Sequence, residues 1–226
     1  MAEARASRLY GRSKGKTLRK EPQRLLSDVL PNYAIAPTGA MEPSAMFARP
    51  VAETWMEIGF GGGEHLVGMA AQHADIGFIG CEPFVNGVAK ALAGAEAAKL
   101  DNVKIGMGDA LETMARLPDA SIGRLFVLFP DPWPKRRQNK RRIISDESLA
   151  AFARVLKPGG HFLFASDIDD YVGWTLARVL RSPDFSWEPG DWLAPWPGSP
   201  PTKYRIKAIR EGRTPAFLTF VRGSTR

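Results

Sequence analysis

Cysteine and histidine are scarce in this sequence of 226 residues, which has one cysteine, Cys81, and three histidines. A single cysteine excludes an internal disulfide framework and a multi-cysteine zinc site. We therefore expect a reducing compartment and no bound metal. No apolar run reaches the roughly 18 residues that cross a bilayer, and the N-terminus lacks the apolar core of a secretory signal. The sequence thus predicts a cytoplasmic protein with no membrane contact.

Internal repeats and disordered composition are also missing. The apolar share of 44% and the charged share of 24% are ordinary for a globular protein. A chain of this length corresponds to one domain. We expect a basic N-terminal arm and covering loop over residues 1–50 and a single folded domain over residues 51–226.

Acidic residues are outnumbered in three segments, and the chain carries a formal net charge of +7. Residues 1–24 hold eight bases and two acids, residues 135–142 hold six bases, and residues 203–213 form a looser basic stretch. A single run of this kind is usually a solvated surface, and a basic arm can also be a transit peptide. Three runs together favour a polyanionic partner, bound by phosphate neutralisation and counterion release.

Short apolar runs alternate with helical patterns from residue 54 onward. The runs typical of strands buried on both faces are Trp55–Ile58, Ile76–Cys81, Val103–Met107, Leu125–Phe129 and His161–Ala165. The helical segments between them are His65–His73, Phe84–Leu100, Leu111–Leu117 and Ser145–Leu156. This alternation predicts an α/β fold, a doubly wound, mostly parallel sheet with helices on both faces. A last strand, Phe217–Val221, is expected to be antiparallel.

Glycines follow the first predicted strand, in the run from Glu57 through Gly59 and Gly61 to Gly63. Ligands of such sheets lie beyond the carboxyl ends of the strands, where glycine lets the backbone turn sharply and approach a ligand. The run departs from the dinucleotide pattern because Glu64 replaces the last glycine, and it lacks the lysine of a phosphate-binding loop. We therefore expect a ligand other than a dinucleotide.

Carboxylates follow the next two strands. Glu82 ends the second strand and can accept hydrogen bonds from both hydroxyls of a ribose, although it could also simply cap the following helix. Asp109 ends the third strand and can accept from the amine of adenine. Together with Glu57, these acceptors suit an adenosine with a positive, phosphate-free tail, and S-adenosylmethionine is such a molecule.

Three prolines surround Asp131 and Trp133 after the fourth strand, directly before the basic run 135–142. Prolines fix the backbone, so both side chains should be held in place. An aromatic ring beside a carboxylate suits a purine, because the ring stacks and the carboxylate accepts N–H donors. We predict no chemistry for the histidines: His65 and His73 should be capping or surface residues on or near the first helix, and His161 should be structural.

The chain resembles the bacterial tRNA (guanine-N7)-methyltransferases over most of residues 54–221. The similarity lies in Glu57–Gly61, Glu82, Gly108–Ala110, Pro130–Lys135 with Asn139–Arg142, Leu156–Gly160, Ser166-Asp167 and Thr202–Tyr204. The run from Phe129 to Arg142 is highly specific for this family, whereas the glycine loop alone is not. Two positions depart from the family pattern: Gln138 stands where histidine is common, and Arg205 stands where glutamate is usual.

The resemblance implies an S-adenosylmethionine-dependent methyltransferase domain that modifies a guanine in tRNA, with guanosine 46 of the variable loop as the family's target. It implies cofactor binding by Glu57, Gly59, Gly61, Glu82, Asp109, Ala110 and Asp131. It implies contacts to tRNA or the target guanine from Lys135, Asp167, Thr202, Lys203, Tyr204 and Arg205. Asp131 is the predicted catalytic residue. No obligatory protein partner is inferred.

Two other functions remain open from the sequence. The Asp131-Pro132-Trp133 run is close to the [ND]-P-P-[FYW] pattern of amino-methyltransferases that act on an exocyclic base nitrogen, although Trp133 replaces the second proline. The chain could also be an RNA-binding protein on an inactive methyltransferase fold, which the three carboxylates at the strand ends disfavour. Binding of labelled cofactor would separate an enzyme from a binding protein.

Overall fold

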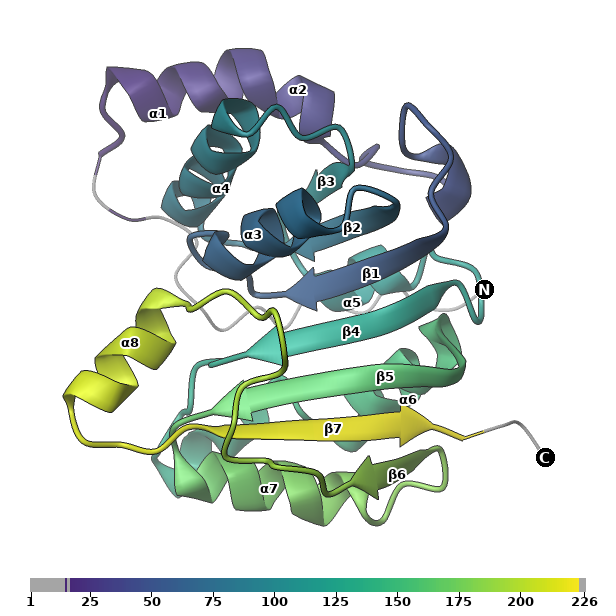
Figure 1. Cartoon of the computed structure of the whole chain (residues 1–226), viewed down its shortest axis with the longest axis vertical. Helices are drawn as coiled ribbons and strands as arrows, with labels where there is room; N and C mark the ends of the chain where they lie inside the picture. The colour runs from purple at the N-terminus through teal and green to yellow at the C-terminus, as the bar shows by residue number, and fades with distance from the viewer. Residues whose placement is uncertain (1–14, 16, 224–226) are drawn as a thin grey trace.

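The computed structural model describes residue 15 and residues 17–223, and its centre is a seven-stranded sheet (Figure 1). The strand order is β3-β2-β1-β4-β5-β7-β6. The strands are β1 Glu53–Ile58, β2 Ile76–Cys81, β3 Val103–Gly106, β4 Ile122–Leu128, β5 Leu156–Ser166, β6 Phe185–Glu188 and β7 Ala216–Arg222. Strands β1 to β5 pair in parallel, and β7 pairs antiparallel with β5 and β6. The predicted doubly wound sheet with its antiparallel last strand is confirmed.

Helices cover both faces of the sheet. They are α1 Lys20–Arg24, α2 Leu30–Tyr33, α3 Glu64–Gln72, α4 Val85–Ala97, α5 Ala110–Met114, α6 Asp146–Val155, α7 Asp169–Val179 and α8 Lys203–Arg210, with the π-helical turn η1 Leu25–Val29 and the 3₁₀ turns η2 Pro43–Ala45 and η3 Arg136–Arg141. Two apolar clusters form, one between the sheet and η1, α3 and α4, the other between the sheet and α5, α6 and α7. In Figure 1, α3 lies in front of the sheet and α5 and α6 lie behind it.

Strand β1 shows why both faces are apolar. Successive side chains of a strand point to opposite faces, so Trp55 joins the α3 and α4 cluster while Met56 joins the α5 to α7 cluster. Trp55 is 6% exposed and Met56 is fully buried. A near-continuous apolar run is therefore the signature of a strand covered on both sides, as the sequence predicts.

Helix α6 shows how local sequence sets a helix boundary. The Ser145 hydroxyl accepts from the Ser148 amide at 3.1 Å, and the Ser148 hydroxyl accepts from the Ser145 amide at 2.9 Å. This reciprocal cap fixes the first turn. Leu149 and Phe152 then bury one face, as expected. The helix ends at Val155, one residue before its predicted end, and β5 begins directly at Leu156, five residues before the predicted start of that strand.

The sequence did not predict five helical segments or one strand, namely the segment 20–33, η2, η3, α7, α8 and β6. Helix α7 buries Tyr171, Thr175 and Val179 at intervals of four residues. Helix α8 buries only Ala208, so it has no apolar stripe to recognise. The helical segment 20–33 lies within the expected arm and loop, and residues 1–14 and 16 of that arm lie outside the described residues.

The carboxyl ends of β1 to β4 meet at one edge of the sheet because these strands are parallel. In Figure 1 their arrowheads point toward α8, which follows at the same edge. The loops after the four strands therefore share one space with the start of α8. Among the described residues, no helix is both long enough and apolar enough to cross a bilayer.

Candidate active site

A cavity of about 880 Å³ opens at this edge of the sheet. Its walls come from the loops after β1, β2, β3 and β4, from the segment 140–145, and from the first residues of α8. Eight of the predicted site residues line it: Gly59, Gly61, Glu82, Asp109, Ala110, Asp131, Lys203 and Tyr204. Five others do not: Glu57, Lys135, Asp167, Thr202 and Arg205. The cavity therefore brings together the predicted residues that follow β1 to β4 and those at the start of α8, and the other five lie outside its lining.

The glycine loop leaves room for a ligand against the backbone. Gly59 has φ +70°, and a Cβ added there would meet no atom within 4 Å. Gly61 has φ +58°, and its added Cβ would lie 3.4 Å from Cε2 of Tyr204. These left-handed conformations favour glycine. The cradle fits the sugar and tail of an adenosyl cofactor, which must approach the backbone closely.

Glu82 shapes this loop from the end of β2. Its Oε2 accepts from the Gly61 amide at 2.7 Å, and its Oε1 accepts from the Phe84 amide at 2.9 Å. Burial raises the pKa of Glu82, nearby Asp131 raises it further, and the two amides and Lys203 oppose this. Each carboxylate oxygen keeps a second lone pair. Glu82 can therefore hold the loop and still accept ribose hydroxyls from the cavity.

Asp109 is fixed in a similar way at the end of β3. Its Oδ1 accepts from the Leu111 amide at 2.9 Å and so caps α5. Gly108 before it has φ +142°, and a Cβ there would meet nothing within 4 Å. The carboxylate stands at the cavity wall beside open space. It is placed to accept from a base amine.

Cys81 also lines the cavity, directly before Glu82. Burial raises the pKa of its thiol to about 12. The sulfur is therefore protonated at neutral pH and does not act as a nucleophile. In the described part of the chain, no grouping of three or more His, Cys, Asp or Glu side chains is arranged to hold a metal ion.

Asp131 stands in a strained loop after β4. Phe129 has φ +49° and Trp133 has φ +44°, both in the left-handed region that bulky residues rarely adopt. Asp131 is exposed and has no hydrogen bond or ion pair with a described residue. Burial raises the pKa of Tyr204, and the charge of Asp131 raises it further. Asp131 and Tyr204 both line the cavity.

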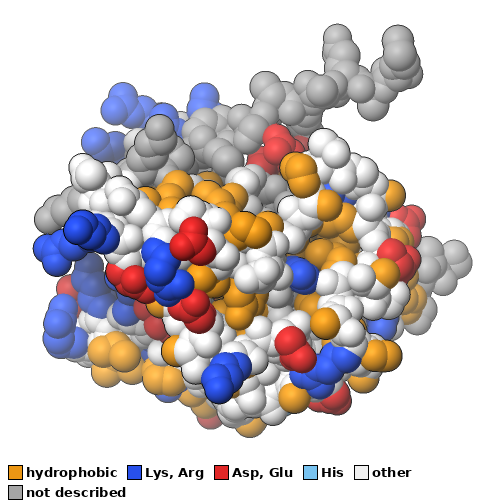
Figure 2. Space-filling model, turned by 90° about the horizontal axis from the view of Figure 1, so that it is seen from above, with side chains coloured by type: hydrophobic (Ala, Val, Ile, Leu, Met, Phe, Trp, Pro, Cys, Tyr) orange, Lys and Arg blue, Asp and Glu red, His pale blue; other side chains and the backbone are white. Residues whose placement is uncertain are grey.

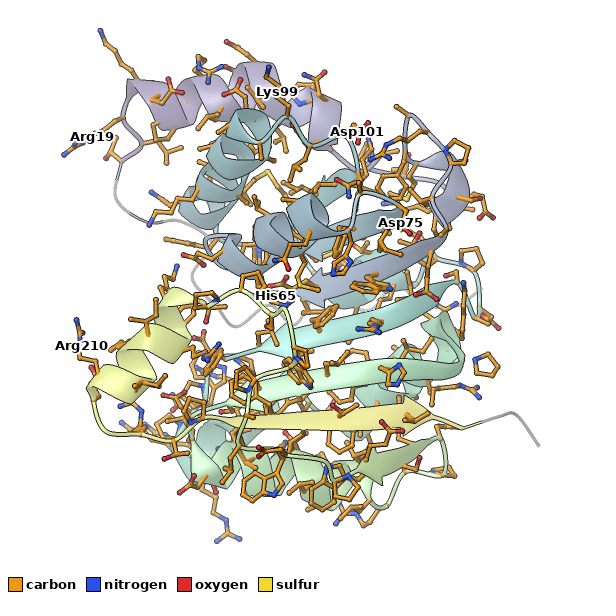
Figure 3. All side chains as sticks on the ribbon, viewed as in Figure 1. Arg19, His65, Asp75, Lys99, Asp101 and Arg210 are labelled. Carbon is orange, nitrogen blue, oxygen red and sulfur yellow. The ribbon has the colours of Figure 1, made fainter. Side chains whose placement is uncertain are left out.

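Glu57 points away from the cavity and pairs with a histidine. Its Oε2 lies 2.8 Å from Nδ1 of His65, and the two side chains are 4% and 2% exposed. The His65 ring packs on Phe126 with centroids 4.9 Å apart. His65 is therefore a buried residue rather than the expected surface or capping residue, as Figure 3 shows between α3 and the sheet. His65 lies four residues before the buried Met69, so the two share one face of α3, and this spacing was the available signal.

The outer predicted residues have partners of their own. Asp167 accepts from Nε of Arg213 at 2.6 Å. Thr202 is buried and caps α8 by accepting from the Arg205 amide at 3.1 Å. The Arg205 guanidinium lies 5.7 Å from the ring centroid of Phe217. Lys135 is exposed at the start of η3.

Three basic residues also line the cavity. The sequence predicted them only as part of the basic run 135–142. They are Lys140, Arg141 and Arg142. The Arg141 guanidinium lies 4.9 Å from the ring centroid of Trp133. Acidic residues at the strand ends thus face basic residues across one opening. This arrangement can bind a cationic nucleoside on the acidic side and a polyanion on the basic side.

The fold and this site define the class of protein. Solved structures with the same fold include the 16S rRNA methyltransferase KamB, at a TM-score of 0.55 with 22% identity, covering 77% of this chain and 89% of that one. Another is precorrin-6y C5,15-methyltransferase from Geobacter metallireducens GS-15, at a TM-score of 0.53 with 14% identity, covering 76% and 80%. The fold is that of the class I methyltransferases.

Sequence relatives define the family more narrowly. A family model described as "Putative methyltransferase" matches residues 52–218. The tRNA (guanine-N(7)-)-methyltransferase of Nitrobacter winogradskyi is 49% identical over 221 residues, 96% of this chain and 86% of its own. That of Azorhizobium caulinodans is 48% identical over 216 residues, 94% of each chain. The chain belongs to the family of the bacterial tRNA (guanine-N7)-methyltransferases.

Proposed function

We infer that this protein transfers a methyl group from S-adenosylmethionine to N7 of a guanine in tRNA. The observation that carries this inference is the cavity itself. Glu82, Asp109 and an open glycine loop form its acidic side, and Asp131 and Trp133 stand between that side and a basic segment. Membership of the family agrees with this arrangement.

The acidic side would hold the cofactor. Glu82 would accept from the ribose hydroxyls, Asp109 from the adenine amine, and Gly59 would admit the tail against the backbone. When bound, the cofactor supplies a methyl group on a positively charged sulfur. Glu57 would support the glycine loop without touching the cofactor, because its ion pair with His65 fixes the end of β1 against α3.

Asp131 would be the catalytic residue. Guanine N7 has a free lone pair, so no base needs to remove a proton before it attacks the methyl group. What the protein must supply is alignment of the purine and stabilisation of the positive charge that develops on it. A carboxylate on a loop fixed by prolines suits both tasks, and Trp133 beside it can stack on the base.

The tRNA would bind along the basic edge of the cavity. Lys135 and its neighbours in η3 are exposed, and Lys203 and Tyr204 bring α8 to the same opening. In Figure 3, Arg210 points outward from α8. Thr202 would support this edge as the cap of α8, Asp167 would place Arg213, and Arg205 would contact phosphate.

The end of the molecule formed by α1 and α4 is a poorer surface for RNA. In Figure 2, which looks down on the α1 and α4 end, Lys and Arg side chains are interspersed with Asp and Glu. Arg24 pairs with Glu96 at 2.6 Å, and Arg49 pairs with Asp101 at 2.9 Å. Arginine side chains that already pair with a carboxylate neutralise fewer RNA phosphates than unpaired ones, and so release fewer counterions.

The finer assignments are proposals of the same kind. We propose guanosine 46 as the target, residues 51–226 as the methyltransferase domain, action in the cytoplasm, and activity without a protein partner. A tRNA transcript with 7-deazaguanosine at position 46 tests the target atom, because it replaces N7 by carbon and keeps the exocyclic amine. We expect methylation of the unmodified transcript and none of the 7-deaza transcript. Persisting methylation would point to an exocyclic nitrogen or another guanine.

A further inference from the structure

Arg142 differs from the other bases of segment 135–142 because its side chain is buried. It is 3% exposed, whereas Lys135 is exposed. Its Nε donates to the carbonyl oxygen of Pro132 at 2.9 Å, and its Nη2 forms an ion pair with Asp170. A guanidinium carries its donors in a rigid fork, so it can hold two such acceptors at once.

Two rings of α7 enclose the Arg142 guanidinium. Its Cζ lies 4.7 Å from the ring centroid of Tyr171 and 4.9 Å from that of Trp174. The same rings hold Ile144: the Tyr171 hydroxyl accepts from its amide at 3.4 Å, and Trp174 Nε1 donates to its carbonyl at 2.8 Å. A desolvated cation is attracted to the faces of aromatic rings. Helix α7 therefore fixes the end of the basic run.

Pro132 is the point at which this anchor reaches the active-site loop. It stands between Asp131 and Trp133, and all three line the cavity. Proline has no backbone N–H, so its carbonyl is the backbone group that the fold can hold. The left-handed conformation of Trp133, with φ +44°, persists only where its surroundings enforce it. The contact from Arg142 supplies that support.

Asp170 completes the anchor from outside the cavity. Its side chain is 70% exposed, whereas that of Arg142 is 0% exposed. Asp170 is not among the described residues that line the cavity. Its carboxylate nevertheless compensates the charge of the buried guanidinium and sets its orientation.

We propose that Asp170 and Arg142 are positioning residues for methyl transfer. Asp170 orients the Arg142 guanidinium, and Arg142 sets the position of Asp131 and Trp133 through the Pro132 carbonyl. The proposal rests on the proposed function, since Asp131 acts on the purine only if that function holds. It gives Arg142 a task unlike that of the exposed bases in the same run, which face the tRNA.

The variants Arg142→Lys and Asp170→Asn test this pair. A lysine keeps the charge, but its single ammonium does not reproduce the fork between Pro132 and the carboxylate. Asp169→Asn is the matched control, because Asp169 is an exposed carboxylate in the same first turn of α7 and has no ion pair with a described residue. Asp170→Glu should rescue the function by restoring the carboxylate.

Steady-state kinetics with unmodified tRNA give the first readout. We expect kcat to fall by about 10- to 100-fold in Arg142→Lys and by less in Asp170→Asn, with KM for tRNA unchanged, because a displacement of about 1 Å can cost that much. Asp169→Asn should match the wild type. A raised KM with unchanged kcat in Arg142→Lys would make Arg142 an RNA contact and overturn the proposal. Equal kinetics for Asp170→Asn and Asp169→Asn would also overturn it.

Hydrogen exchange gives a second readout that needs no catalysis. Amides of residues 131–142 should exchange faster in both test variants, while amides of the parallel strands keep their wild-type rates. Wild-type exchange in this segment overturns the proposal even if activity falls. If Arg142→Lys does not fold, Asp170→Asn carries the test. A wild-type protein that fails to methylate tRNA refutes the proposed function, whereas normal methylation by the folded variants refutes only the positioning pair.

Discussion

The two sides of the cavity are built differently. On the cofactor side, Glu82 and Asp109 accept backbone amides that fix them before any ligand arrives. On the substrate side, Asp131, Lys135 and Lys203 are exposed and form no ion pair with a described residue. The carboxylates of the cofactor side are thus fixed by hydrogen bonds to the backbone. On the substrate side, Arg142 holds the backbone at Pro132, and the Asp131 carboxylate is left exposed. We therefore expect variants of the cofactor side to change the affinity for the cofactor, and variants of the substrate side to change kcat or the binding of tRNA.

Asp131→Ala should have the largest effect. Loss of a group that aligns the purine and stabilises its charge should lower kcat by about 100-fold or more. The affinity for tRNA should stay close to the wild-type value, because it comes from dispersed phosphate contacts. Single-turnover methylation and filter binding measure the two quantities, and Asp131→Asn separates the charge from the shape of the side chain. Near-normal turnover would make Asp131 only a turn residue.

Glu82→Ala should mainly weaken cofactor binding. Hydrogen bonds to a charged group contribute about 1.5–3 kcal/mol, so the affinity should fall roughly tenfold or more. Calorimetric titration measures this. Glu64→Ala is the control, because Glu64 is exposed beside the same glycine loop and does not line the cavity. Unchanged affinity in a folded Glu82→Ala protein would refute the ribose assignment.

Neutralising Lys135, Arg136 and Arg137 with glutamine should affect RNA binding alone. Each lost phosphate contact lowers the slope of log affinity against log salt by about 0.7–0.9. The cofactor affinity should not change, which sharpens the contrast between the two sides. Lys99→Gln is the control, since Lys99 lies at the end of α4 away from α8 in Figure 3. An unchanged slope would assign the run to solubility instead.

Arg205→Glu should have the smallest effect. Asp167 pairs with Arg213, and Arg205 forms no ion pair with a described residue, so a contact to phosphate is the role that we favour. A glutamate there should raise KM for tRNA a few-fold and leave kcat at saturation nearly unchanged. Arg205→Gln distinguishes the lost positive charge from the added negative one. A clear rise in kcat would show that the glutamate usual in the family is catalytically useful here.

The placement of Gly59, Gly61 and Glu82 at one edge of the sheet was predictable from the sequence, because it depends on local signals. Gly59 and Gly61 follow one strand and Glu82 ends the next, so a parallel sheet brings them to one edge without further information. The pairing of Glu57 with His65 was not readable, because it depends on how α3 packs against β1. The position of His65 on a helix does not by itself predict an ion pair with Glu57, eight residues earlier on β1.

For the substrate side, the sequence predicted only the basic composition of the segment and not the position of each side chain. The run 135–142 follows Asp131 closely in the sequence, yet one of its six bases, Arg142, is buried. Its partners lie on α7, which the sequence analysis missed. A run of like charges does not show which of its residues is buried. A buried base needs an acceptor such as Asp170, and that acceptor comes from another element. The cavity positions of Lys203 and Tyr204 likewise depend on how α8 docks.

The most direct test of the account is to incubate the wild-type protein with S-adenosylmethionine carrying a labelled methyl group and with unmodified tRNA, and then to digest the RNA to nucleosides. The account predicts that the label appears in N7-methylguanosine, and that Asp131→Ala gives none above background while still binding tRNA. Label in an exocyclic amino group, or tRNA binding with no transfer by the wild type, would contradict it.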